Sequence, residues 1–597
     1  MDRIIGRTTS LLLLLCTLGL SHPSGAAEDV PMKAMRDEMT RSMGMQLTGL
    51  PQPYFLAYRM REITEVSVSA YLGSLVSSRD SRSRALYVGL RVGDYKLDNT
   101  NFVSFKDSLD SLSALPPGWL FGRQQITIDD DYNQIRREIW LATDPEYKKA
   151  VEQFAAKKAA LQSQDQADDV PDFSREHPNT YFESAKATSV DASTLEEVAR
   201  QVSSVFRQVP EIRSSQVSIH VHNVYTRYIN SEGTEYTKAN VVTKVEIQAR
   251  AAAKDGVPLE DTEQIFVNSP SELSAQELST RAQQIIARLQ KLRTAGSFDR
   301  YNGPVLFEGE AAGEIFAQVF APALIASREP LSDHPQLHDF VEQESGRFGG
   351  GTLNDLIGGR VLPDSVDVVD NPRINSFQGQ RLMGAYSVDD DGVPGRVNPV
   401  VQSGVLKLVL ASRVPAPGST ESTGNFRGIS ASPSNLIFTS SKLASEQELR
   451  RMLLEHAKAR GYDYGIVVRH AKIPEPKASV WMGLSAPENN LLEVYRVYAD
   501  GHDDLMHGEQ LSSMTVASFK NILAVGDKPV VYNSTFLPGS TLFMNLKMDD
   551  ISAVTSLPIA SYVVPSLLFD EVTLKKTSRS IPKEPVSNPP ALSVTGR

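Results

Sequence analysis

The sequence predicts an α+β fold divided into at least two folded units. The chain has 597 residues, more than a single hydrophobic core usually organises. Segments that alternate between apolar and polar residues, as half-buried antiparallel strands do, are interspersed with segments of helical periodicity. Apolar residues make up 41% and charged residues 22%, which is typical of a soluble globular protein.

Residues 1–27 are expected to be a secretory signal peptide. Arg3 and Arg7 precede a short apolar stretch over 11–20, and small residues lead to a cleavage site after Ala27. The apolar stretch is half the roughly 20 residues of a membrane-spanning helix, so no membrane span is expected. We therefore expect an exported protein, periplasmic or extracellular. Cleavage would also remove the one cysteine, Cys16, which excludes disulfides, thiol nucleophiles and cysteine-ligated metals from the mature chain.

The first unit, predicted over 28–298, opens with a helix whose methionines, from Met32 to Met43, recur at helical spacing and pack on the core. Strands are expected over 54–97, 216–228 and 234–251, the last two joined by an NSEG hairpin turn at 230–233. Helices are expected over 129–161, 193–209 and 274–292, and a polar connector over 162–180.

The second unit, predicted over 299–580, begins with a strand at 303–308 and an alanine-rich helix that runs to Ala326. From Gly349 onward glycine, valine and turn residues dominate, which predicts a β-rich domain with one clear helix over 445–460. Residues 581–597 hold several prolines and little apolar mass, which predicts a disordered tail.

Four segments of the second half carry a family resemblance. They are VDVVDNP (366–372), VDDDGVPGRVNPVVQSGVLK (388–407), STGNFRG (422–428) and PIASYVVPSLLFDEVTLKK (558–576). In order and wording they resemble the C-terminal region of the TldD/PmbA family, and the resemblance extends over about residues 210–576.

The resemblance implies a two-domain α+β architecture, with antiparallel strands and long helices in the first domain and a β-rich second domain. The family includes metallopeptidases that act on peptides or unfolded chains inside a closed, paired assembly. In active members a helix carries His-Glu-x-x-x-His: the histidines bind zinc, the glutamate acts on the attacking water, and a later cysteine completes the site. A PmbA-like branch lacks this motif and pairs with an active partner.

In this chain the motif position reads Gly309-Glu310-Ala311-Ala312-Gly313-Glu314. Glu310 keeps the position of the catalytic glutamate, whereas Gly309 and Glu314 replace the two histidines. Catalytic zinc generally needs three protein ligands, so the inherited site is missing and no cofactor is expected. Glu310 and Glu314 would share a helix face, and two like charges at that spacing are typical of a solvated face.

A rebuilt zinc site is the alternative. It would combine Glu314 with His334 or His338, which have helical i,i+4 spacing, although Pro335 and the polar surroundings favour a surface insertion there. His220 and His222 alternate on a predicted strand and face the same side, but no third ligand is visible beside them.

The sequence also narrows the other classes of function. The net charge of −11, without a basic run, excludes nucleic acid as a probable partner. The acidic run Asp389-Asp390-Asp391 lacks the spacing of an EF-hand calcium loop and is interpreted as a structural or interface turn. The glycines at 349–351 are not followed by Gly-Lys-Ser/Thr, which excludes a phosphate-binding loop of the P-loop type. No Gly-x-Ser-x-Gly pentad occurs in the sequence, so nothing indicates a serine hydrolase.

We therefore expect an exported TldD/PmbA-type pseudoenzyme, a non-catalytic subunit that binds peptide or unfolded polypeptide and pairs with a related chain or with itself as a dimer. An active metallopeptidase with a rebuilt zinc site and a structural envelope protein are the alternatives.

Overall fold

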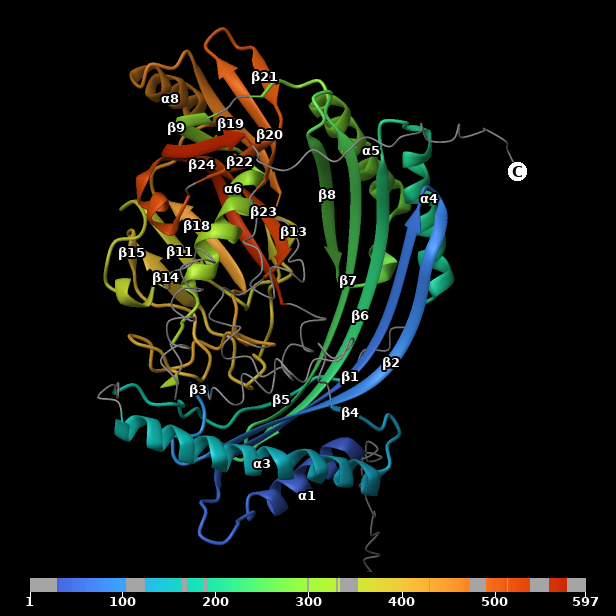
Figure 1. Cartoon of the computed structure of the whole chain (residues 1–597), viewed down its shortest axis with the longest axis vertical. Helices are drawn as coiled ribbons and strands as arrows, with labels where there is room; N and C mark the ends of the chain where they lie inside the picture. The colour runs from blue at the N-terminus through green and yellow to red at the C-terminus, as the bar shows by residue number, and fades with distance from the viewer. Residues whose placement is uncertain are drawn as a thin grey trace, which may run out of the picture.

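The structure is a computed structural model that describes residues 29–103, 124–163, 169–185, 190–297, 300–328, 331–332, 353–428, 430–472, 490–512, 514–536 and 558–576. The expected signal peptide, the expected tail, and both His334 and His338 lie outside these residues. Two large sheets with their own helices organise the described chain, which confirms the predicted two-domain α+β architecture (Figure 1).

The N-terminal domain is built on a seven-stranded sheet with the order β4-β2-β1-β6-β7-β5, in which β8 also pairs with β7. The strands are β1 (Pro53–Tyr71), β2 (Ser74–Val92), β4 (Gln124–Ile126), β5 (Thr180–Phe182), β6 (Ser214–Asn230), β7 (Glu235–Ala252) and β8 (Pro258–Val267). The predicted NSEG hairpin is confirmed: it joins β6 to β7, and Gly233 adopts φ 96°, a conformation that favours glycine.

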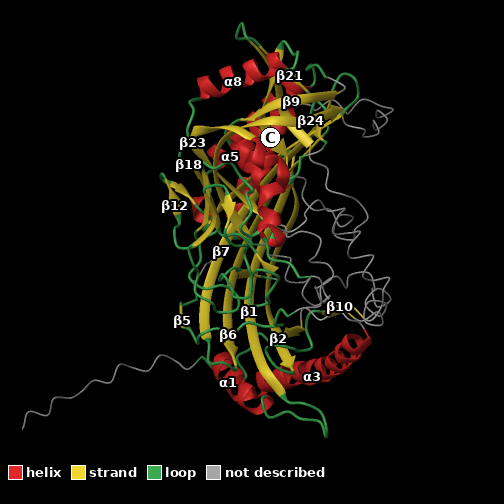
Figure 2. Ribbon diagram, turned by 90° about the vertical axis from the view of Figure 1, so that its left-hand side faces the viewer, coloured by secondary structure: helices red, strands yellow, loops and turns green. Residues whose placement is uncertain are grey.

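Four helices cover one face of this sheet. They are α1 (Val30–Ser42), α3 (Tyr132–Ser163), α4 (Ala192–Ser204) and α5 (Ala275–Leu292). Helices α1 and α3 lie at one end and α4 and α5 at the other, as Figures 1 and 2 show. The methionines of α1 are buried as predicted. The other sheet face is turned toward the side on which the C-terminal domain lies (Figure 1).

The C-terminal domain holds an eleven-stranded sheet with the order β15-β14-β11-β18-β24-β22-β20-β19-β9, in which β21 also pairs with β20 and β23 with β24. Because β24 pairs with β9 as well as with β22, the second part of the sheet closes on itself. Its strands are β9 (Arg300–Phe307), β11 (Val366–Asp370), β14 (Asn398–Gln402), β15 (Val405–Leu406), β18 (Asn435–Ser440), β19 (Tyr464–Lys472), β20 (Asn490–Tyr498), β21 (Asp503–Met506), β22 (Glu509–Leu511), β23 (Ile522–Thr535) and β24 (Ile559–Lys576). The predicted helix over 445–460 is confirmed as α8 (Glu446–Ala459), which Ser445 caps.

An acidic turn fastens the two domains together. The Asp390 carboxylate accepts hydrogen bonds from Lys238 of β7 at 2.5 Å and from Arg61 of β1 at 2.9 Å. These cations hold the pKa of Asp390 well below its usual range, although burial alone would raise it. The Asp389 carboxylate accepts backbone N–H bonds from Val393 and Phe426. Protein donors therefore occupy the oxygens of Asp389 and Asp390, as expected for a structural turn at an interface.

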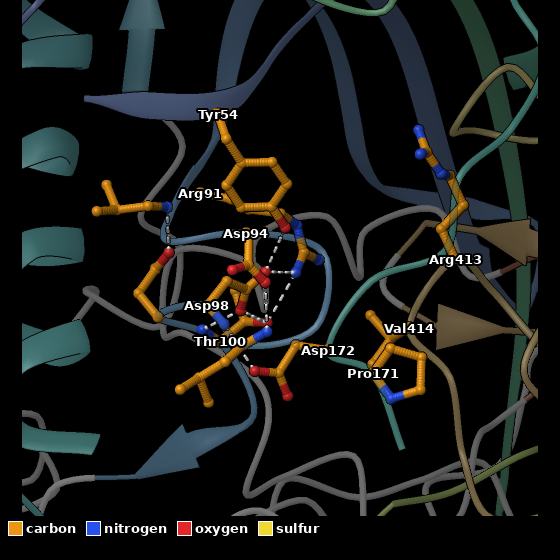
Figure 3. Close-up of polar contacts among 12 residues, drawn as sticks. Tyr54, Arg91, Asp94, Asp98, Thr100, Pro171, Asp172, Arg413 and Val414 are labelled. Atoms are coloured by element: carbon orange, nitrogen blue, oxygen red, sulfur yellow. Dashed lines mark hydrogen bonds and ion pairs between the residues drawn. The ribbon is translucent and has the colours of Figure 1, made fainter. Parts of the chain in front are cut away.

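A second buried network corrects the prediction for the connector over 162–180. Asp98 accepts hydrogen bonds from Tyr54 and Arg91, both at 2.7 Å, and its own backbone N–H donates to Asp172 (Figure 3). Asp172 also accepts from Lys157 of α3 at 2.5 Å and from Arg328 at 3.0 Å. The middle of this segment is therefore part of the core, because the Asp172 carboxylate meets cations from two different parts of the chain.

Among the helices that the structure describes, none combines the length and the apolar character that crossing a bilayer would require.

Candidate functional site

The position of the family's metal motif lies where β9 turns into helix α6 (Glu310–Ile315). The turn residue is Gly309, with φ 59° and ψ −123°, a conformation that L side chains rarely adopt. The Gly309 N–H donates to the Ser566 hydroxyl of β24 at 2.9 Å. At the first motif position the zinc-binding histidine is therefore absent, and the backbone conformation of Gly309 would also disfavour a histidine there.

Helix α6 is short because its chain changes helical type. A π-helical turn over 316–320 and a 3-10 turn over 321–324 follow it, where an alanine-rich helix to Ala326 was predicted. Pro322 has no N–H to donate, so a regular α-helix cannot continue through it. Gly313 lies so close to β23 that an added Cβ would stand 2.8 Å from the Cβ of Tyr532. This close approach places the second motif position, Glu314, inside the core.

Glu314 is 2% exposed, so the interpretation of Glu310 and Glu314 as a solvated pair is wrong for this residue. Its Oε1 lies 2.6 Å from Nδ1 of His470 on β19, and its Oε2 accepts the Ala471 N–H at 2.5 Å. Nε2 of His470 lies 3.7 Å from Oδ1 of Asp261, a fully buried residue of β8. A histidine thus does stand beside the second motif position, but it comes from a different strand.

The charges alternate across the boundary between the two domains. Asp261 also accepts from Arg288 of α5 at 2.8 Å, and Arg288 donates to Glu263 at 2.6 Å. Burial opposes the protonation of His470, but the charge of Glu314, together with Asp261, outweighs it and raises the histidine pKa well above its ordinary value. The raised pKa favours the imidazolium form of His470, which stands between two carboxylates.

Glu310, in the position of the catalytic glutamate, stands at the outer edge of this cluster and is exposed. Loss of hydration, and then the charge of Glu314, raise the pKa of Glu310 from 4.5 to about 7. Because the residue keeps solvent contact, water competes with this effect. A carboxyl group with a pKa near neutrality is suited to proton transfer.

These residues do not fit the zinc site of the family. Gly309 offers no ligand, and both oxygens of Glu314 are engaged, one with Nδ1 of His470 and the other with the Ala471 N–H. Within the described part of the chain, this cluster does not bring three ligand atoms within 4.8 Å of one another. His334 and His338, the other predicted ligands, lie outside the described residues.

Sequence reasoning missed His470 and Asp261, which complete the cluster. No neighbouring residue in the sequence indicates a functional role for either of them. The segment around His470, VVRHAK, is typical of an ordinary strand, and the segment around Asp261, LEDTEQ, is typical of a polar edge strand. Only the pairing of β19 beside β9 and the approach of β8 bring them to Glu314.

Comparisons with known proteins agree with this geometry. Residues 300–470, from the start of β9 to His470, match the family model described as the PmbA/TldA metallopeptidase C-terminal domain. Two curated relatives named metalloprotease TldD homolog, both from Buchnera aphidicola, are 27% and 28% identical over 95 residues. That match covers 16% of this chain and 19% of each relative, so it spans about a fifth of their length.

Solved structures resemble the whole fold. TldE from Thermococcus kodakarensis aligns with a TM-score of 0.54 at 13% identity, covering 91% of this chain and 99% of that one. A protein from Thermotoga maritima, described as a proposed modulator of DNA gyrase, aligns with a TM-score of 0.55 at 14% identity over the same shares. At such identities the likeness is one of fold. The family-model match over residues 300–470 shows that the chain carries the C-terminal domain of the TldD/PmbA family.

Proposed function

We propose that this protein is a non-catalytic TldD/PmbA-type subunit, exported by its N-terminal signal, that binds peptide or unfolded polypeptide and pairs with a related chain or with a second copy of itself. One observation carries the non-catalytic part of the proposal: the ion pair between Glu314 and His470 occupies the place of the second zinc ligand. The glycine backbone at the first ligand position points the same way.

The proposed pairing and peptide binding draw on the fold. One face of the N-terminal sheet is turned toward the side on which the C-terminal domain lies (Figure 1). Part of this face is polar, with Glu65 opposite His222 and Ser67 opposite His220, and we propose that a peptide segment lies there. The likeness to TldE supports pairing, because it extends over 99% of that chain. Export is supported by the charge and apolar pattern of residues 1–27.

A specific observation favours an active peptidase as the second candidate. Glu310 keeps the position of the catalytic glutamate, and its pKa is raised to about 7, the range in which a carboxylate can act as a general base near neutral pH. In this candidate Glu314 would leave His470 and bind the metal together with His334 or His338.

The test begins with the mature chain, residues 28–597, isolated from its native source. We expect co-purification of a related chain or a dimer by light scattering, retention of an unfolded protein such as reduced, denatured casein, and no cleavage of it. A monomer that does not retain casein would contradict pairing and binding. Cleavage that is lost in Glu310→Gln would overturn the non-catalytic proposal and establish the second candidate.

A further inference from the structure

The polar face of the N-terminal sheet carries a cluster that lies apart from the motif position. Glu65 on β1 stands directly opposite His222 on β6 in the antiparallel register, and the next pair along the same face is Ser67 opposite His220. One ligand atom from each of Glu65, His220 and His222 lies within 4.8 Å of the other two. This supplies the third residue that the neighbouring sequence of the two histidines did not show.

The fold dictates that these three side chains share a face. Their neighbours in sequence, Val66 on β1 and Ile219 and Val221 on β6, are buried in the core beneath α4 and α5. Because side chains alternate along a strand, Glu65, His220 and His222 must point to the opposite face. The two imidazole rings lie nearly parallel, with 6.4 Å between their centroids and 15° between their planes. A slip of one residue in register would bury the whole set, so strong core packing holds the cluster in place.

Two imidazoles and one carboxylate form a donor set suited to zinc and its neighbours in the first transition row, and a poor one for calcium or magnesium, which prefer oxygen ligands. At metal–ligand bonds of about 2.1 Å, tetrahedral ligand atoms stand about 3.4 Å apart. The side chains would therefore have to draw together by at most about 1.4 Å, which rotation about their χ angles can supply. All three are half-buried, so an ion can reach them from solvent.

The surroundings are compatible with a cation. Lys244 of β7 stands opposite His220, but its ammonium lies 3.1 Å from the Glu246 carboxylate, which offsets its charge. A polar pocket of about 260 Å³ begins beside His220. Its lining includes the hydroxyl groups of Ser67 and Ser218, which a remaining coordination position would meet together with water. It also includes Arg79, a cation that would have to turn toward solvent when a metal ion binds.

We propose that Glu65, His220 and His222 form a binding site for one divalent ion, zinc or a neighbouring metal of the first transition row, on the polar face of the N-terminal sheet. Three protein ligands leave at least one position for water or for a ligand atom from a bound molecule. This site is separate from the motif position, where Glu314 and His470 neutralise each other.

The test uses the mature chain after chelator treatment, titrated with Zn²⁺ in a calorimeter and with Co²⁺ followed by visible absorption. We expect one ion per chain, tetrahedral Co²⁺ bands, and a zinc-dependent rise in the unfolding temperature. Each of Glu65→Gln, His220→Gln and His222→Gln should weaken Zn²⁺ binding by at least about tenfold, because even outer-shell partners of metal ligands contribute that much.

Two control variants separate this site from other histidines. The double substitution His334→Ala/His338→Ala removes the ligands of the rebuilt peptidase site, and His502→Gln removes an exposed histidine next to Asp500. Both should leave Zn²⁺ affinity unchanged. All metal-free variants should keep the circular dichroism spectrum and the urea unfolding midpoint of the original chain. Any loss of Zn²⁺ binding is then due to the missing ligand rather than to unfolding. Absence of stoichiometric binding, or binding that survives all three substitutions or disappears in either control, would overturn the proposal.

Discussion

The Glu314–His470 ion pair offers the sharpest test of how the motif position was rebuilt. Replacing His470 with glutamine removes the cation that lies between two carboxylates. The Glu314 side chain is 3% exposed and Asp261 is fully buried, so neither carboxylate can be hydrated in its place. A carboxylate and a histidine cation about 4 Å apart attract each other by about 4 kcal/mol at an effective dielectric constant of about 20. Removing one partner of a buried pair generally costs about 3–5 kcal/mol.

We expect the lower end of that range for His470→Gln, about 3 kcal/mol, because its side chain is 15% exposed and Arg288 still neutralises Asp261. Glu314→Gln should cost less, about 2 kcal/mol, since His470 keeps Asp261 as a partner. The double variant should cost about 3 kcal/mol rather than the sum, which corresponds to a coupling energy of about 2 kcal/mol.

The pH dependence has a definite sign. The pKa of His470 is raised in the folded state, so the stabilisation is fully present below the unfolded pKa of about 6.5 and is lost as pH rises through the folded pKa. The difference in free energy of unfolding between the original chain and His470→Gln should therefore be largest just below about pH 6.5, remain substantial at neutral pH and shrink in alkaline buffer.

The assay is urea unfolding of the four chains of the cycle, followed by circular dichroism at neutral and alkaline pH. His456→Gln is the matched control, because His456 lies 3.9 Å from Asp570 on the surface and its loss should change stability by less than about 0.5 kcal/mol. Additive effects of the two single substitutions, or a cost of His470→Gln that does not fall with rising pH, would refute the account of a buried charged pair.

Four further substitutions test other parts of the structure. Glu310→Gln removes a carboxyl group whose pKa is raised to about 7. The substitution should therefore stabilise the chain above pH 7, by at most about 1 kcal/mol because the residue is exposed, and should have no such effect in acid. Urea unfolding midpoints measured across this pH range test both expectations. Gly309→His should not create a zinc site and should cost about 1–2 kcal/mol, because the backbone there has positive φ; calorimetry with Zn²⁺ and thermal unfolding check both. Asp390→Asn should cost about 3 kcal/mol and loosen the domain interface, seen as faster proteolysis between the domains, whereas unchanged proteolysis would argue against that role. Lys157→Met should cost about 2 kcal/mol in urea unfolding, since Asp172 keeps Arg328, and a neutral result would show that the buried pair adds nothing.

Local patterns in the sequence predicted much of the N-terminal domain. The methionine spacing of α1, the NSEG turn and the capped helix α5 all depend on residues within one or two turns of each other, so periodicity and turn chemistry suffice to place them. The same reasoning failed at the connector, because the polar residues around Asp172 are buried only through cations that arrive from α3 and from the C-terminal domain.

The sequence by itself determined that residues of the family's zinc site are replaced: glycine at position 309 has no donor atom, and the one cysteine, Cys16, lies near the N-terminus, far from the C-terminal region in which the family carries its cysteine ligand. Only the tertiary structure decided what took their place. His470 reaches Glu314 because β19 pairs with β9, and Glu65 meets His222 because β1 pairs with β6 in one register. Such contacts join residues far apart in the chain, and their strand partners are set by the packing of whole sheets rather than by neighbouring residues.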